Sequence, residues 1–189
     1  MPPSSTNTPM KKTVWTFGLI SGAIMAATMI ATMPFLERIG FDKGLVVGYT
    51  SMVLAFLLVY FGIRSYRDNI GGGTIGFGRA LAIGVLITVI SSVCYTATWE
   101  VLYYNFMPDF GTRYEQFELD HARAKGASEA EMAKMQADAK KFVEDYKNPV
   151  YNSAMTFLEP LPVGLLIALV SAGVLRRKRR RTDPELQAA

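Results

Sequence analysis

The stretch VWTFGLISGAIMAATMIATMPFL at residues 14–36 decides the fold class, because it contains no charged residue. At about 1.5 Å per residue, a helix of this length crosses a hydrocarbon core of about 30 Å. Lys11 and Lys12 precede it, as lysines precede the apolar region of a signal peptide. That region usually spans only about 7–15 residues, so cleavage is the minor alternative. The stretch therefore predicts a transmembrane helix.

Three further apolar segments follow, at residues 44–63, 80–100 and 153–175. With the first, they predict an all-α integral membrane bundle of four transmembrane helices. The composition agrees, since 50% of the 189 residues are hydrophobic, only 19% are charged, and the mean hydropathy is +0.20. These values argue against a disordered chain or a protein that coats nucleic acid.

The polar segments complete the domain organisation. Residues 1–12 begin with a Pro-, Ser- and Thr-rich run and are predicted to be a disordered cytoplasmic N-terminus, with Met10 as an alternative start. Residues 13–175 form the transmembrane domain, which includes an insert at 101–149 between the third and fourth helices. Residues 176–189 form a basic cytoplasmic tail.

The insert is predicted to be helical. Ser128 and Glu131 follow Gly126 and have the spacing of a capping box, in which each side chain bonds the backbone of the other residue. Apolar residues then recur every three or four positions. We expect short helices at about 113–125 and 128–147, forming an amphipathic cap on the membrane surface.

The positions of lysine and arginine predict the orientation. Basic residues precede the first helix, occupy the loop between the second and third helices, and form the run RRKRRR at 176–181. Four spans place these regions on one side, and the positive-inside rule assigns that side to the cytoplasm. We therefore expect a bacterial cytoplasmic (inner) membrane protein with both termini cytoplasmic and an extracytoplasmic insert.

Small residues recur at every fourth position in three of the predicted helices. Such residues let membrane helices approach closely. The positions expected to carry helix packing are Gly18, Gly22, Gly84 and Gly164. A homodimer interface at Gly18 and Gly22 is the alternative to packing within one chain. Val59 is expected to face lipid, and residues such as Met25 and Phe56 to face lipid or fill gaps.

The loop between the second and third helices matches G-x-G-x-x-G at residues 71–76. That dinucleotide fingerprint has meaning only within a βαβ unit, whereas this segment joins two transmembrane helices. A weaker hypothesis is a loop that binds lipid phosphate through backbone N–H groups and arginines. Its residues are Arg64, Arg67, Gly72, Gly73 and Arg79. The alternative is a flexible loop with snorkelling arginines.

A candidate polar site lies at the outer face. It comprises Glu100, Glu159, Trp99, Tyr103 and Arg38. An ionisable side chain near the hydrocarbon boundary is a functional hypothesis by default, and Glu159 is followed by two prolines that invite a kink or a partner. The alternative is a pair of interfacial carboxylates wetted by headgroup water.

For Glu159 in particular, the predicted depth gives four alternative candidates for a polar partner. They are Trp99, Tyr103, Tyr151 and Arg38.

The composition gives little support for a disulfide, a metal site or nucleophilic catalysis. The chain has one cysteine, Cys94, and one histidine, His121, so we expect no intrachain disulfide, no metal site and no Cys/His nucleophile. No cofactor and no catalytic residue is expected. The basic tail is interpreted as a topology anchor that attracts anionic lipids, and no nucleic acid partner is expected.

Several segments together resemble one protein family. They are FGIRSYRDN at 61–69, IGFGRAL at 75–81, Tyr95 with Trp99, and YNSAMTFLEPLPVGLL at 151–166. Over about residues 11–178 the chain resembles the bacterial domain-of-unknown-function family numbered 4199. The resemblance implies a small multi-pass membrane protein and no assigned activity or catalytic residue. The long basic tail departs from the family pattern.

Two functions are compatible with this sequence. The first is a non-enzymatic structural or partner subunit of the cell envelope that acts through the insert, with a protein partner or a second copy of the chain. The second is a small transporter or lipid-handling protein that uses Glu100 and Glu159. The middles of helices one, two and four lack charge, which favours the first over transport.

Overall fold

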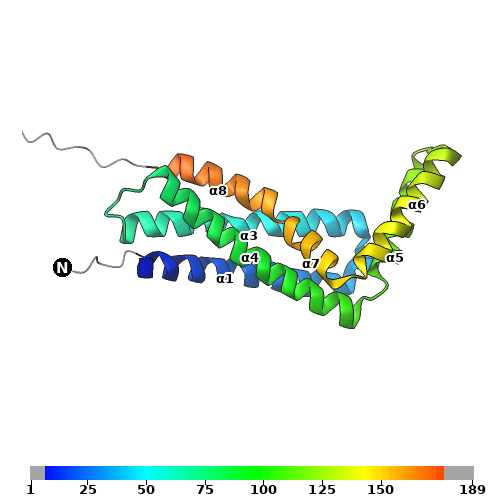
Figure 1. Ribbon diagram of the computed structural model, residues 1–189, viewed down its shortest axis with the longest axis horizontal. Helices are drawn as coiled ribbons and strands as arrows, with labels where there is room; N and C mark the ends of the chain where they lie inside the picture. Colours follow the sequence, from blue (N-terminus) through cyan, green and yellow to red (C-terminus); the bar gives the residue numbers. More distant parts are fainter. Residues whose placement is uncertain (1–6, 177–189) are drawn as a thin grey trace, which may run out of the picture.

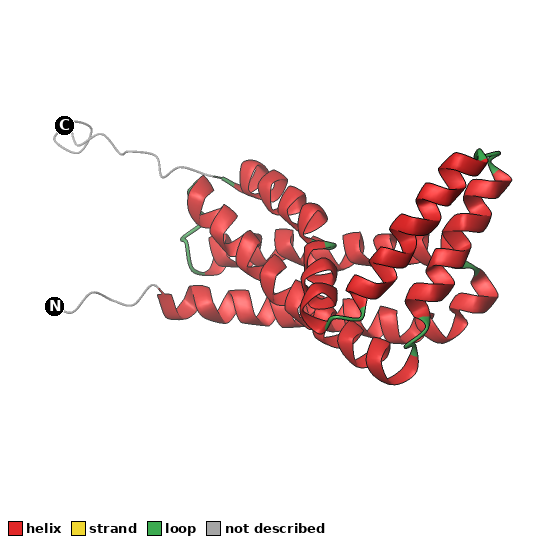
Figure 2. Cartoon of the chain, turned by 45° about the vertical axis from the view of Figure 1, so that its right-hand side comes forward, coloured by secondary structure: helices red, strands yellow, loops and turns green. Residues whose placement is uncertain are grey.

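The computed structural model describes residues 7–176, apart from the side chains of residues 7, 8 and 37, and its regular elements are helices. The chain order is α1 (Asn7–Thr32), a 3-10 turn η1 (Met33–Phe35), α2 (Leu36–Ile39), α3 (Phe41–Asn69) and α4 (Phe77–Phe106). It continues through α5 (Phe110–Ala124), α6 (Glu129–Tyr146), α7 (Pro149–Leu158) and α8 (Leu161–Leu175). Figures 1 and 2 show a long bundle with a helical hairpin at one end.

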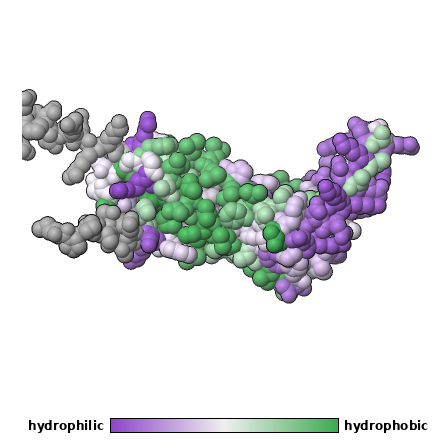
Figure 3. Space-filling model, in the orientation of Figure 1, coloured by the Kyte–Doolittle hydropathy of each residue, from purple (hydrophilic) through white to green (hydrophobic). Residues whose placement is uncertain are grey.

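Four helical segments are long and apolar enough to cross a membrane. They are Pro9–Phe35, Phe41–Asn69, Phe77–Phe106 and Pro149–Leu175. On the face shown in Figure 3, an apolar belt covers the bundle, and the α5–α6 hairpin is mostly hydrophilic. These features indicate a membrane protein.

The basic loop between α3 and α4 lies at the same end of the bundle as the start of α1 and the end of α8. The α5–α6 hairpin lies at the opposite end (Figure 1).

Several predicted boundaries need correction. Residues 7–12 are helical rather than disordered, because Pro9 lies in the first turn of α1, where a helix needs no proline N–H. The first helix ends at Thr32 rather than residue 36, since Pro34 falls in the 3-10 turn. The third helix continues to Phe106, six residues past its predicted end. Residues 1–6 and the tail beyond Arg176 lie outside the described part of the chain.

The fourth span is two helices rather than one. Pro160 and Pro162 have no N–H to offer the carbonyls of Thr156 and Leu158, so the helical ladder is interrupted there. α7 therefore ends at Leu158, and α8 begins at Leu161. α7 also begins at Pro149, where the insert was expected to end, and Asn148 caps it by accepting hydrogen bonds from the backbone N–H groups of Val150 and Tyr151.

The helices pack through the predicted small residues. A Cβ built on Gly18 would lie 2.8 Å from Cβ of Ile90, and one on Gly22 would lie 2.6 Å from Cβ of Cys94. These two glycines of α1 thus contact α4 of the same chain. Across the bundle, a Cβ at Gly84 would lie 2.8 Å from Cβ of Ala168 on α8.

Helices α8 and α4 also pack closely at Gly164, where an added Cβ would lie within 3 Å of the Thr88 side chain. Two serines add hydrogen bonds between helices. Ser21 donates to the carbonyl of Ala55 over 3.0 Å, and Ser91 lies 3.2 Å from the carbonyl of Gly18. Hydrogen bonds and close packing replace the hydrophobic driving force that lipid removes.

The expectation that Val59 faces lipid is wrong, because Val59 is fully buried and packs at Gly84. Met25 and Phe56 are also buried, whereas Phe61 is exposed. Apolar residues are favourable both inside a membrane bundle and on its lipid surface, so hydropathy alone does not separate the two environments.

The α5–α6 hairpin has the predicted local signals. Gly126 has φ +81°, which allows the turn after α5. Ser128 then caps α6: its Oγ accepts from the Glu131 N–H over 3.3 Å, and the Glu131 carboxylate accepts from the Ser128 N–H over 2.8 Å. Both helices begin and end within four residues of the predicted positions.

Candidate functional site: a chamber between α3 and α7

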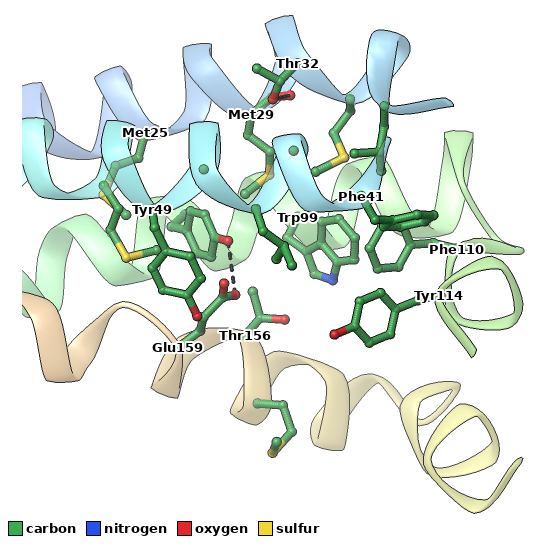
Figure 4. Close-up of a pocket in the computed structure, with 18 of the residues that line it drawn as sticks. Met25, Met29, Thr32, Phe41, Tyr49, Trp99, Phe110, Tyr114, Thr156 and Glu159 are labelled. Atoms are coloured by element: carbon green, nitrogen blue, oxygen red, sulfur yellow. Dashed lines mark hydrogen bonds between the residues drawn. The ribbon is translucent and has the colours of Figure 1, made fainter. Parts of the chain in front are cut away.

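The half of the bundle next to the hairpin encloses a cavity of about 550 Å³, which we call the chamber. Its walls come from the end of α1, the start of α3, the middle of α4 and the α7–α8 junction, and the hairpin adds residues of α5 and α6. Figure 4 shows α3 on one side of the chamber and α7 on the other. The chamber is therefore a gap between two membrane helices that do not pack closely against each other there.

The chamber lining is mostly apolar and aromatic. The methionines come from α1, the η1 turn, α3 and α7, and the aromatic rings come from α3, α4, α5 and α6. The aromatic residues are Phe41, Tyr49, Tyr95, Trp99, Phe110, Tyr114, Phe142 and Tyr146. Such a lining suits a ligand with a large apolar part.

An aromatic cluster closes the chamber at the end next to the hairpin and joins the hairpin to the bundle. The ring of Phe41 on α3 lies 5.8 Å from that of Phe110 and 5.7 Å from that of Tyr114 on α5, both edge-on. Trp99 of α4 lies 4.8 Å from Phe110. Edge-to-face contacts at these distances are favourable, so the hairpin is fixed to α3 and α4.

The polar groups of the chamber are few, and most have partners within the chain. Thr156 is hydrogen-bonded to Asn152 and to the Tyr146 hydroxyl. Burial, and then the neighbouring Glu118 carboxylate, raises the pKa of Tyr114 to about 12. Tyr114 therefore stays neutral at physiological pH.

Glu159 lies at the α7–α8 break and borders the chamber. Its Oε2 accepts a hydrogen bond from the Tyr95 hydroxyl over 3.1 Å, and Tyr49 of α3 points its hydroxyl toward the same carboxylate (Figure 4). The break caused by the prolines ends α7 at Leu158, beside the chamber. Glu159 is the next residue and therefore lies at the chamber wall. The hydrogen-bond partner of Glu159 is therefore Tyr95 and none of the four expected candidates, which are Trp99, Tyr103, Tyr151 and Arg38.

The predicted outer-face residues are distributed over separate contacts. Glu100 accepts a hydrogen bond from Ser153 over 2.9 Å and does not line the chamber. Trp99 lines the chamber and bonds Asn152. Tyr103 is buried against the ring of Tyr146, 5.5 Å away, and Arg38 is exposed at the end of α2.

Sequence reasoning missed Tyr95 and Tyr49 as members of the site. Tyr95 had one signal, since it lies one helical turn before Trp99 and therefore shares its face of α4. Tyr49 lies on a different helix, and no local pattern relates it to Glu159.

The predicted lipid-phosphate loop forms a tight turn. Gly72 and Gly73 have φ of +60° and +78°, a backbone region that suits glycine. The Gly73 N–H already donates to the carbonyl of Arg67 over 2.9 Å. Arg64 and Arg67 both lie in ion pairs with Asp68, and Arg79 is exposed in the first turn of α4. Lipid binding by this loop stays a prediction.

Comparison with known proteins gives a family and no activity. The family model described as "Protein of unknown function (DUF4199)" matches residues 16–177. No curated protein and no solved structure matches the chain. The matched segment contains most of the first apolar span, the other three spans, the hairpin and every residue that lines the chamber. The chain therefore belongs to the DUF4199 family.

Proposed function

We propose that this protein is a non-enzymatic membrane protein that binds an amphiphilic or lipophilic molecule in the chamber. The chamber itself is the supporting observation: about 550 Å³, an apolar and aromatic lining, and few polar groups. Small-molecule sites commonly have volumes of about 300–1,000 Å³ and the same kind of lining. This function belongs to the lipid-handling alternative and needs no catalytic residue.

Access from the bilayer is supported by the residues beside the chamber. On α3, Leu45 and Val46 are 43% and 67% exposed, and on α7, Met155 and Leu158 are 41% and 56% exposed. These exposed apolar side chains flank the chamber and suit contact with lipid tails. A ligand would then pass between α3 and α7 from the hydrocarbon, while the hairpin covers the chamber toward water.

Binding is favoured over transport by the packing of the rest of the bundle. Transport needs a polar path through the membrane. Beyond the chamber, the buried core among the described residues contains no charged side chain and is filled mainly by apolar ones, including Phe56, Ile63 and Ile87. The other hypothesis, a partner subunit that acts through residues 101–149, stays a prediction.

We propose the orientation from the positive-inside rule, with both termini cytoplasmic and the hairpin outside. The structure supports it, because Lys11, Lys12 and Arg79 lie at one end of the bundle and the hairpin at the other. The test is Lys125→Cys in a Cys94→Ala background, labelled with an impermeant thiol reagent in intact cells. Labelling only after lysis would invert the orientation.

Occupancy of the chamber can be measured at Trp99. The chain has two tryptophans, and Trp15→Phe leaves Trp99 as the only one. In nanodiscs of unbrominated lipid, a brominated-tail maltoside should quench Trp99 saturably at a low mole fraction. Trp15, which is 56% exposed on α1, reports ordinary partition into the bilayer in a Trp99→Phe variant.

A filled chamber provides the matched control. Gly48 lines the chamber, and a Cβ built there meets no atom within 4 Å, so Gly48→Phe adds bulk at the chamber wall without a clash at Cβ. Val46→Phe adds bulk on the outer side of the same helix, outside the chamber lining. Gly48→Phe should abolish saturable quenching, and Val46→Phe should preserve it. Quenching of Trp99 that follows bulk partition, like that of Trp15, would refute the proposed function.

A further inference from the structure

The chamber contains a single acidic or basic side chain among the described residues. Of the side chains that line it, Glu159 alone is carboxylic, and no lysine, arginine or histidine is present. No ion pair joins Glu159 to a basic side chain in the described part of the protein. An ionisable group within a membrane bundle usually faces a water-filled cavity or pairs with a group of opposite charge, so Glu159 offers a position for a cation.

The hydrogen bonds around Glu159 leave it able to accept a further donor. Tyr95 donates to Oε2, and Oε1 has no hydrogen bond from a described residue. Glu159 is exposed and lines the chamber, so the side that does not contact Tyr95 is open to it. A ligand group in the chamber can therefore reach the carboxylate directly.

The surroundings of Glu159 favour a cation over other polar groups. The rings of Tyr49, Tyr95 and Trp99 line the same chamber, and Tyr49 lies beside Glu159 in Figure 4. Aromatic faces attract ammonium groups, and cages of such rings recognise quaternary ammonium ligands. We propose that the chamber binds a monocation with an apolar body, a lipophilic amine or quaternary ammonium, whose charge lies at Glu159. This inference rests on the proposed function and specifies its ligand class.

The absence of basic residues from the lining argues against an anionic or phosphate-bearing ligand. A phosphate group needs arginine, lysine or a cluster of backbone N–H groups. An anion in this chamber would instead meet the Glu159 carboxylate. The apolar body of the cation has the methionine and phenylalanine side chains to pack against.

The test uses three amphiphiles with the same brominated dodecyl tail and different heads. The heads are trimethylammonium, maltoside and sulfate, and Trp99 quenching is measured in the Trp15→Phe protein in nanodiscs of zwitterionic lipid. Mole fractions are corrected for partition with the single-Trp15 variant. The trimethylammonium compound should reach half-saturation at a mole fraction about tenfold below that of the maltoside, and the sulfate should require more than either.

Glu159→Gln supplies the decisive comparison, since it keeps the shape and removes the negative charge. It should bring the trimethylammonium and maltoside midpoints to within about twofold of each other. Tyr95→Phe, which keeps the ring and removes the hydroxyl donor, should retain most of the preference for the cation.

The outcomes separate the two proposals. Equal midpoints for all three heads in the wild-type protein would overturn the cation proposal and leave the proposed function intact. An unchanged preference in Glu159→Gln would do the same. If none of the three compounds quenches Trp99 saturably, the proposed function itself fails.

Discussion

The indole Nε1 of Trp99 donates a hydrogen bond to Oδ1 of Asn152 over 3.0 Å and joins the middle of α4 to the first turn of α7. Asn152 is fully buried. Its Oδ1 also accepts from Thr156, and its Nδ2 donates to the backbone carbonyl of Tyr146 at the end of α6. One amide thus connects the bundle, the hairpin and the wall of the chamber.

Replacing that amide should destabilise the protein. Asn152→Leu has a similar size and removes one hydrogen bond from each of three groups, the Trp99 indole, the Thr156 hydroxyl and the Tyr146 carbonyl, at a cost of about 1–3 kcal/mol. Asn105→Leu is the control, because the Asn105 amide is exposed and donates only to the carbonyl of Val101. Thermal unfolding in nanodiscs measures both. Equal midpoints for the two variants would show that the Asn152 contacts add no stability.

The glycine contacts predict a matched pair of Gly→Leu changes. At Gly84 a new Cβ would lie 3.2 Å from the backbone Cα of Ala168, so Gly84→Leu forces α4 and α8 apart at a cost of about 1–3 kcal/mol. At Gly173 a Cβ meets no atom within 4 Å, so Gly173→Leu should leave stability unchanged or raise it. Thermal unfolding in detergent measures the difference. A Gly84→Leu midpoint at or above that of Gly173→Leu would contradict close packing of α4 on α8.

Much of this fold follows from local signals in the sequence. The absence of charge over 14–36 and the charges that bound the other spans predict four helices, and the Ser128 and Glu131 spacing predicts the start of α6. The chamber could not be predicted in this way. It depends on the separation of α3 from α7 and on the level of the Glu159 break relative to Tyr49 and Tyr95, which are tertiary properties. Val59 illustrates the same limit, since an apolar residue gives no sign of which face of its helix is covered.

Two adjacent serines on α4 predict opposite effects of the same substitution. Ser91 Oγ lies 2.9 Å from the carbonyl of Ile87 and 3.2 Å from that of Gly18, whereas Ser92 Oγ is buried without a partner among the described residues. Ser91→Ala should reduce the free energy of unfolding by about 0.5–1.5 kcal/mol, and Ser92→Ala should leave it unchanged or raise it. Denaturation in mixed micelles compares them. A larger loss at Ser92 than at Ser91 would reveal a partner for Ser92 that this chain does not provide.

The capping box predicts a pH dependence of the hairpin. Hydrogen bonds from the backbone N–H and the hydroxyl of Ser128 lower the pKa of Glu131 below its ordinary value of 4.5. The charged cap therefore contributes stability above pH 4.5, and the contribution is lost as the pH falls through the lowered pKa of the folded state. Carbon NMR of the Glu131 carboxyl measures the titration. Ser128→Ala removes the hydroxyl bond and keeps the backbone N–H bond, so it should raise that pKa part of the way toward 4.5. An unchanged titration would mean that the Ser128 hydroxyl does not bond the carboxylate.

Substitution of Glu159 should change ligand binding without lowering the stability of the protein. Its carboxylate has one hydrogen bond, from Tyr95, and otherwise faces the chamber, so Glu159→Leu removes little packing and removes a charge from membrane depth. We expect the empty Glu159→Leu protein to be as stable as the wild type within about 0.5 kcal/mol, or more stable, as is common where a residue serves binding rather than folding. The same variant should lose the preference for a cationic head. Thermal unfolding in nanodiscs without added amphiphile measures the first effect, and Trp99 quenching measures the second. A Glu159→Leu protein that is clearly less stable than Glu159→Gln would instead show that the carboxylate holds α7 to α4 through Tyr95, and that its role is structural.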